Sequence, residues 1–124
     1  MGKSCYYMTG KTSSKIDDAQ NKCKSISAKL PIIKSESENR CILGLMSRQE
    51  TWVWLGMKRT DGKMVWFDGT PAEPSEGAPY SAWRINEPSS QAEEICAYLN
   101  FDNGWNNNKC DHSPNAGPFV LCQK

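Results

Sequence analysis

The stretch WRINEPSSQAEEICAYLNFDNGWNNNKC, residues 83–110, decides how the rest of the chain is interpreted. It places two carboxylates, Glu87 and Glu94, close in sequence to two adjacent amides, Asn106 and Asn107, and it contains two cysteines. Carboxylate and amide oxygens are hard ligands, which Ca²⁺ prefers and Zn²⁺ does not. The stretch therefore predicts a cation and ligand site built on loops.

Composition restricts the class of protein. With 124 residues the chain is long enough to bury a core, and we expect residues 1–124 to form a single domain. Its 15 Lys and Arg against 14 Asp and Glu leave a net charge of +1, which gives no reason to expect nucleic acid as a partner. No apolar run has the length of a membrane span, so we expect no membrane insertion of this segment.

The cysteines indicate disulfide bonds. There are six of them, without a CxxC pair, and His112 is the only histidine. Zinc-ribbon and thioredoxin-like sites therefore lack their ligands or their redox pair. Disulfides form in oxidising compartments. We expect a secreted domain or the extracellular domain of a membrane protein.

The first 46 residues predict one strand and two helices. Residues 5–8 are β-prone. A helix follows, with Ser13 or Ser14 as N-cap and an end at Leu30, before Pro31. Its apolar face repeats at helical spacing through Ile16, Ala19, Cys23 and Ile26. A capping box, Ser35 to Glu38, opens the second helix. Its apolar face is expected to carry Ile42, Leu45 and Met46, with Cys41 beside them.

The rest of the chain predicts strands and one long loop. Short apolar runs at residues 52–57, 64–67, 95–99 and 118–122 are typical of strands, and Asp61-Gly62 is typical of a hairpin turn. Residues 70–94 contain four prolines and should form a long loop, which in a compact domain is often functional. We expect an α+β fold with two helices beside a mainly antiparallel sheet.

These elements carry a series of landmarks that spans nearly the whole chain. In order they are Cys5-Tyr6-Tyr7, Ala19-x-x-x-Cys23, Ala28-x-Leu30, Trp54-Leu55-Gly56-Met57, Trp66-Phe67-Asp68-Gly69, Trp83-x-x-x-Glu87-Pro88, Cys96, Gly104-Trp105-Asn106, Cys110 and Phe119-Val120-Leu121-Cys122. Each landmark alone is weak, but their order resembles that of a C-type lectin-like domain. The resemblance implies that fold, with a long loop region that carries the binding site.

The resemblance also implies disulfide pairs. They are Cys23 with Cys122 and Cys96 with Cys110. Cys5 stands where longer members have a cysteine whose usual partner lies upstream, and Cys41 is not a usual family position. With the other four assigned by resemblance, we predict that Cys5 pairs with Cys41.

The predicted site follows from the same resemblance. Sugar-binding members hold Ca²⁺ with a Glu-Pro-Asn motif, a Glu two residues before the next Cys, and a Trp-Asn-Asp motif. The matching residues here are Glu87, Ser89, Glu94, Asn106 and Asn107. Ser89 replaces the usual Asn and Asn107 the usual Asp, so one negative charge is lost. Calcium affinity tracks ligand charge, and we expect a dissociation constant on the order of 10⁻⁴ to 10⁻³ M. A cis peptide is implied at Glu87-Pro88.

The function implied is a carbohydrate-binding module, weakly Ca²⁺-dependent, whose partner is a glycan or glycoprotein. The alternative is a Ca²⁺-independent domain that binds a protein receptor or other non-sugar ligand through the long-loop face. Nothing in the sequence positions Asp102, Glu93 and Glu94 as a hydrolytic acid and base, and we expect no enzyme activity.

Several features allow a purely structural interpretation. Trp54, Trp66 and Trp105 are expected in the core, because large aromatic side chains dominate core burial. Trp52, Tyr80 and Trp83 are either anchors or sugar platforms. Glu93 and Glu94 are either ligands or a solvated face. Glu73-Pro74-Ser75 repeats the Glu-Pro-Ser tripeptide without the flanking Trp and Cys. His112 is expected in a surface loop.

Overall fold

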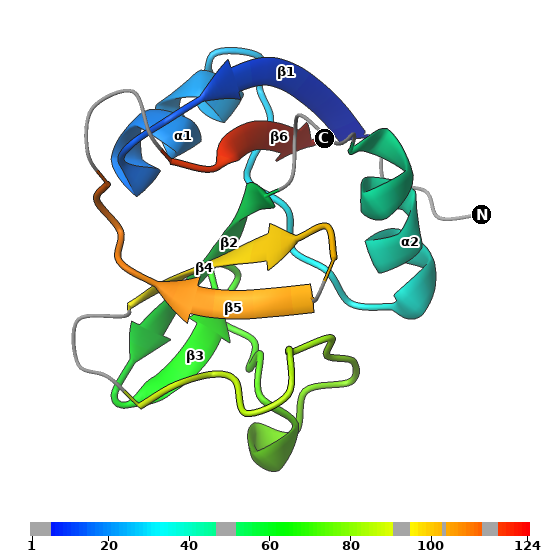
Figure 1. Ribbon diagram of the computed structural model, residues 1–124, viewed down its shortest axis with the longest axis vertical. Coiled ribbons are helices and arrows are strands. Elements are labelled where there is room, and N and C mark those ends of the chain that lie inside the picture. Colours follow the sequence, from blue (N-terminus) through cyan, green and yellow to red (C-terminus); the bar gives the residue numbers. More distant parts are fainter. Residues whose placement is uncertain (1–5, 47–51, 91–94, 103, 113–116) are drawn as a thin grey trace.

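The computed structural model describes residues 6–46, 52–90, 95–102, 104–112 and 117–124. Within these residues the chain forms helices beside one sheet, which confirms the predicted α+β class (Figure 1). The elements in chain order are β1 (Tyr6–Thr12), α1 (Ile16–Lys24), α2 (Glu36–Leu45), β2 (Trp52–Thr60), β3 (Lys63–Trp66), a 3-10 helix η1 (Pro74–Glu76), β4 (Cys96–Asn100), β5 (Gly104–Asn108) and β6 (Phe119–Gln123).

The sheet places β5 at one edge. Its strand order is β1-β6-β2-β4-β5, and β3 pairs with β2 outside this path. The pairing of β2 with β6 is parallel and the other pairings are antiparallel. The β2–β3 hairpin turns at Asp61 and Gly62, whose φ angles are 51° and 81°, as the Asp-Gly signal predicts. The described part of the long loop after β3, residues 67–90, lies near β3 and β5, away from α1 and β1 (Figure 1).

The start of α1 differs from the prediction. Lys15 is the N-cap and makes no side-chain capping hydrogen bond, so the expected cap at Ser13 or Ser14 was wrong. The Ser13 carbonyl instead accepts a hydrogen bond of 3.1 Å from the indole nitrogen of Trp54, a core residue. This contact holds the segment before the helix against the core.

The end of α1 also differs from the prediction. The helix ends at Lys24, well before Leu30. Ser27 takes a left-handed φ of 59°. The N–H of Ala28 returns to the carbonyl of Cys23 at 2.9 Å and that of Ser27 to Lys24 at 3.0 Å, which is a Schellman motif. Serine is uncommon at the left-handed position, where glycine is usual, and so the early end was missed.

The capping box of α2 forms in a modified way. The Ser35 hydroxyl accepts from the N–H of Glu38 at 3.2 Å, as predicted. The Glu38 carboxylate accepts from the N–H of Lys34 at 2.6 Å, one residue before the expected donor. Leu45 is 43% exposed, which corrects its place on the apolar face, and Met46, just after the helix, is buried.

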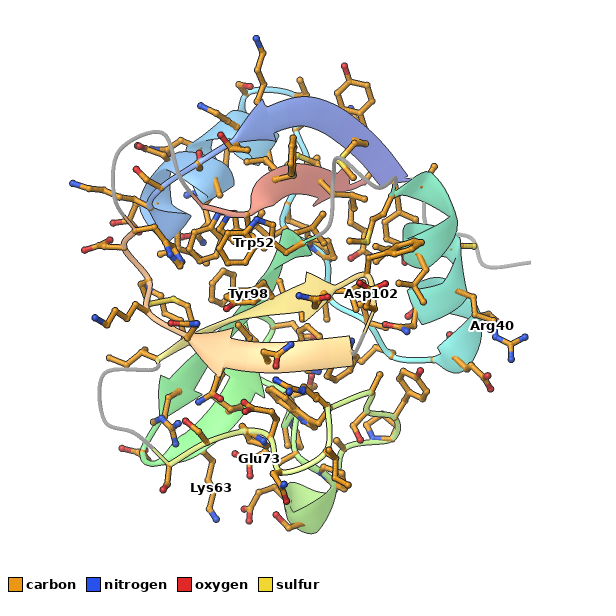
Figure 2. All side chains as sticks on the ribbon, viewed as in Figure 1. Arg40, Trp52, Lys63, Glu73, Tyr98 and Asp102 are labelled. Atoms are coloured by element: carbon orange, nitrogen blue, oxygen red, sulfur yellow. A yellow bond between two sulfur atoms is a disulfide. The ribbon has the colours of Figure 1, made fainter. Side chains whose placement is uncertain are left out.

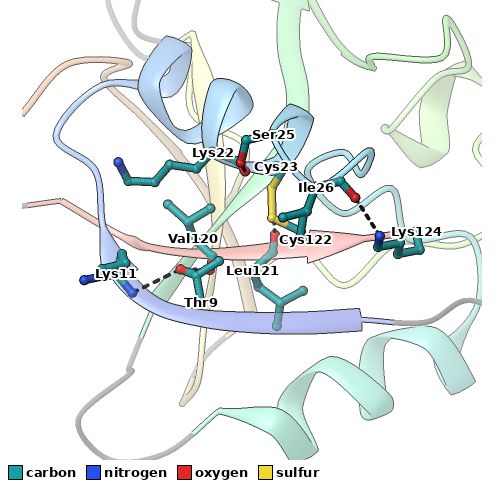
Figure 3. Close-up of a disulfide and its surroundings, with 10 residues drawn as sticks. All are labelled: Thr9, Lys11, Lys22, Cys23, Ser25, Ile26, Val120, Leu121, Cys122 and Lys124. Carbon is teal, nitrogen blue, oxygen red and sulfur yellow. Dashed lines mark hydrogen bonds between the residues drawn. A yellow bond between two sulfur atoms is a disulfide. The ribbon is translucent and has the colours of Figure 1, made fainter.

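The core and the disulfides largely follow the predictions. Trp54, Trp66 and Trp105 are fully buried. The disulfides Cys23–Cys122 (Figure 3) and Cys96–Cys110 are those that the resemblance implies. Cys41 is a free, half-buried thiol in the structure. Its predicted partner Cys5 lies outside the described residues, so the Cys5–Cys41 pair stays a prediction.

His112 was expected in a surface loop, and the structure corrects this. It is half-buried against aromatic rings, with centroid distances of 5.3 Å to Trp52 and 5.7 Å to Trp54. Trp52 in turn packs edge-on against Tyr98 at 4.7 Å (Figure 2). Trp52 is therefore an anchor for this cluster. In the described part of the chain, no helix is long and apolar enough to cross a membrane.

Candidate functional site

The second half of the long loop runs along the free edge of β5. Trp83 and Trp105 form a parallel bridge. The N–H of Arg84 donates to the carbonyl of Trp105 at 3.0 Å, and the N–H of Trp105 donates to the carbonyl of Ala82 at 2.9 Å. Gly104 permits this approach, because a Cβ there would lie 2.5 Å from the Ala82 oxygen. The loop thus covers the edge of β5 as a short extra strand would.

β5 is a strand that the sequence did not predict. Glycine and asparagine are depleted in strands, and four of its five residues are of these two types. The buried ring of Trp105 fixes the strand by packing edge-on against Trp66, Tyr80 and Trp83. Its indole nitrogen donates to the side-chain oxygen of the buried Asn39 on α2 at 2.9 Å. Tertiary packing therefore overrides local propensity here.

The loop makes a tight turn just before Glu87. The N–H of Glu87 donates to the carbonyl of Arg84 at 2.9 Å. Asn86, the third residue of the turn, has a left-handed φ of 67°, as a type II turn requires. The Glu87–Pro88 peptide is cis, as the resemblance implies. The turn presents Ile85 to solvent with 82% of its surface exposed.

Three of the five predicted ligands meet directly after this turn. The N–H of Ser89 donates to Asn107 Oδ1 at 2.7 Å, and Asn107 Nδ2 donates to the Ser89 carbonyl at 2.9 Å. The N–H of Asn107 donates to Glu87 Oε1 at a longer 3.4 Å. Asn107 is only 3% exposed. Its amide therefore clamps the loop onto β5 in addition to offering an oxygen atom.

The other two predicted ligands are Asn106 and Glu94. Asn106 Nδ2 donates to the carbonyl of Gly104 at 3.0 Å. Glu94 lies outside the described residues, as does Glu93. Glu87, Ser89 and Asn107 are therefore the predicted members that the structure brings together.

Arg59 on β2 reaches the same place, and the sequence reasoning missed it. Its Nη2 donates to the Ser89 carbonyl at 2.5 Å, and its Nη1 lies 3.4 Å from the Gly62 carbonyl. The Ser89 carbonyl thus accepts from both Arg59 and Asn107. Arginines near hairpin turns usually point into solvent, and no local pattern distinguishes this one. The contact arises only from the fold.

Both Glu-Pro-Ser copies use their carboxylate on a sheet edge. Glu73 Oε2 accepts from the N–H of Met64 on β3 at 2.7 Å, and Glu87 Oε1 accepts from Asn107 on β5. The bond to Glu73 is short, whereas that to Glu87 is long. The first copy is therefore a structural anchor for the start of the loop. Glu87 holds its carboxylate more loosely, beside Ser89 and Asn107.

These residues fit calcium by donor type but only poorly by charge. Glu87 offers a carboxylate, and Ser89 and Asn107 offer neutral oxygens, all of which are hard ligands. Arg59 brings a permanent positive charge to the Ser89 carbonyl. No group of three or more His, Cys, Asp or Glu side chains that could hold a metal occurs in the described part of the chain. Glu87, Ser89 and Asn107 thus offer calcium hard oxygen atoms, but only one of the three is a carboxylate.

Residues 12–124 match the family model of the lectin C-type domain. Human CD209 antigen is 33% identical over 122 residues, in an alignment that covers 97% of this chain and 28% of the relative. The chain therefore spans little more than a quarter of the length of that relative.

Solved structures share the fold over the whole chain. The carbohydrate-recognition domain of the mouse scavenger receptor C-type lectin has a TM-score of 0.80 and 24% identity, covering 100% of this chain and 92% of that chain. A calcium-independent type II antifreeze protein has a TM-score of 0.78 and 24% identity, covering 100% and 88%. At these identities the likeness establishes the fold alone, and the fold is the one that the sequence landmarks implied.

Proposed function

Because the chain belongs to the C-type lectin domain family, we propose that it is a carbohydrate-binding module of a secreted or cell-surface protein, weakly dependent on calcium. It acts by binding and not as an enzyme, and its partner is a glycan or a glycoprotein. The matched mouse domain is a carbohydrate-recognition domain, which supports this proposal. The two disulfides support an extracellular location, because such bonds persist in oxidising compartments.

The observation that carries the proposal is the meeting of Glu87 and Asn107 at Ser89. A carboxylate offers about four acceptor positions, and the bond from Asn107 uses one of them. Glu87 is half-buried at the loop surface and can accept hydrogen bonds from further donors. Sugar hydroxyls are such donors. The loop therefore presents a held carboxylate to a hydroxyl-rich ligand.

Calcium would be held by Glu87, Ser89 and Asn107, together with Glu94 and Asn106 as the other predicted ligands. When bound, the ion would attract the hydroxyl oxygens of the sugar. We propose a dissociation constant on the order of 10⁻⁴ to 10⁻³ M, since the set has fewer negative charges than the family pattern.

A glycan array with millimolar Ca²⁺ or with EDTA tests the proposal. The domain should bind glycans more strongly with Ca²⁺ than with EDTA, and Glu87→Gln should lose this binding because it removes the negative charge. Glu76→Gln is the matched control, since Glu76 lies on η1 and pairs with Lys63 at 3.5 Å. Absence of glycan binding at any Ca²⁺ concentration, or equal binding by Glu87→Gln, would refute the proposal.

The alternative is a calcium-independent domain that binds a protein or other non-sugar ligand through the same long-loop face. Two observations favour it: Ile85 is an exposed apolar side chain beside Glu87, and the Ser89 main chain is already held by protein donors. The calcium-independent antifreeze protein shows that the fold exists without calcium. Isothermal titration with Ca²⁺ separates the two functions, because the alternative predicts no heat.

A further inference from the structure

The main chain of Ser89 is held from two strands. Asn107 on β5 bonds to its N–H and its carbonyl, and Arg59 on β2 bonds to the same carbonyl. The main-chain N–H of Arg59 also donates to the carbonyl of Ile95 at 2.8 Å, next to the start of β4. Arg59 therefore joins β2, the β2–β3 turn and the loop that carries Glu87.

The Arg59 side chain carries a positive charge that is not removed near neutral pH. Its bond to Ser89 is partly buried, and there salt and water screen charges less than at an exposed surface. This fixed cation is bonded to the Ser89 carbonyl, two residues after Glu87. The same cation repels a divalent ion that approaches Glu87, Ser89 and Asn107.

We propose that Arg59 is a positioning residue that performs the structural task of a bound cation, holding the turn of residues 84–89 in place, and that it lowers the affinity of this site for calcium. The proposal rests on the ligand site placed above at Glu87, Ser89 and Asn107. It concerns calcium and the loop, and it does not depend on which ligand the loop binds.

Calorimetric titration with CaCl₂ of Arg59→Gln tests the charge. The variant should bind Ca²⁺ more tightly than the unchanged domain by roughly tenfold, which corresponds to about 1.4 kcal/mol. Arg40→Gln is the matched control, because it removes the same charge from an exposed pair with Glu36 on α2. Unchanged Ca²⁺ affinity in Arg59→Gln, or an equal gain in Arg40→Gln, would overturn the proposal.

Hydrogen exchange of the amides of residues 84–89 in EDTA tests the positioning. Arg59→Lys keeps the charge but cannot present the planar fork of donors, so exchange should become faster while Ca²⁺ affinity stays low. Arg59→Lys still tests the positioning role if Arg59→Gln does not fold. Exchange in Arg59→Lys equal to that of the unchanged domain would contradict the proposal that Arg59 holds residues 84–89 in place. If exchange becomes faster in Arg59→Lys but the unchanged domain binds no glycan on the array, the carbohydrate proposal is refuted and the role of Arg59 stands.

Discussion

The side-chain amide of Asn107 and the main chain of Ser89 form two hydrogen bonds with each other, one in each direction. The amide oxygen accepts from the Ser89 N–H, and the amide nitrogen donates to the Ser89 carbonyl. A carboxylate in the same place could form only the first bond, and its second oxygen would face the Ser89 carbonyl. The change that adds negative charge for calcium therefore breaks half of the clamp.

Asn107→Asp should consequently destabilise the domain in EDTA and strengthen its calcium binding. The lost hydrogen bond contributes about 0.5–1.5 kcal/mol, since the Ser89 carbonyl keeps its bond from Arg59. The added carboxylate should raise Ca²⁺ affinity, since affinity follows ligand charge. Melting temperatures in EDTA and in CaCl₂, with a calorimetric titration, measure both effects.

Asn100→Asp is a suitable control for this variant. It adds the same charge on β4, where the Asn100 side-chain oxygen accepts from the N–H of Asp102 at 3.0 Å and a carboxylate can do the same. It should leave calcium affinity unchanged. If Asn107→Asp also leaves that affinity unchanged, Asn107 is not a calcium ligand.

Asn39 connects α2 to the strand that carries the site. Asn39→Ala would leave the buried indole N–H of Trp105 without its acceptor. The free energy of unfolding should fall by about 1–3 kcal/mol, as measured by urea denaturation. Ser37→Ala, at an exposed position of the same helix, should change it little. A loss below about 0.5 kcal/mol in Asn39→Ala would show that this bond contributes no more than a surface contact.

The sequence predicted best those features that depend on neighbours in the chain. Asp61-Gly62 specifies its turn because both residues tolerate positive φ, and Ser35 specifies a helix start because its hydroxyl reaches an N–H three residues later. Ser27 shows the limit of such signals. Ser27 follows α1 in the left-handed conformation, which is expected at glycine and not at serine, so its residue type gives no signal that the helix ends there.

The site was predicted less completely because its contacts span the chain. Arg59 and Ser89 are 30 residues apart, and Asn39 and Trp105 are 66 apart. Such pairs depend on the strand order of the sheet, which no local pattern encodes. The landmarks around Glu87 and Asn107 predicted which residues form the candidate site, but the two Asn107–Ser89 hydrogen bonds and the contact of Arg59 became visible only in the fold.

The pairing of Cys41 can be tested directly. We expect a Cys5–Cys41 disulfide in protein that has folded in an oxidising compartment, because such a compartment leaves few thiols unpaired. Peptide mapping without reduction should find the two residues in one linked fragment. Cys41→Ser should lower stability by about 2–4 kcal/mol, and adding Cys5→Ser should lower it no further. Alkylation of Cys41 before any reduction would show that the thiol is free, as it is in the structure.

The environment of His112 disfavours its charged form. The pKa of His112 lies below the ordinary value of 6.5, and the largest cause is burial of the ring. The charge of Lys109 lowers the pKa further. The charge of Asp111 and a hydrogen bond to the Lys109 main chain raise it and so oppose the shift. Its Nε2 is buried among the aromatic rings without a hydrogen-bond partner in the described part of the chain. An N–H at that position would have no hydrogen-bond acceptor among the residues that the structure describes.

The stability of the domain should therefore fall as the pH is lowered from about 6.5 toward the depressed pKa of His112. In that range the unfolded chain binds a proton at His112 that the folded domain does not, so acid favours unfolding. His112 is the only histidine, and His112→Phe keeps a ring against Trp52 while removing the titration. The difference in melting temperature between pH 7 and pH 5 should be smaller in this variant. Equal differences would show that protonation of His112 does not oppose folding.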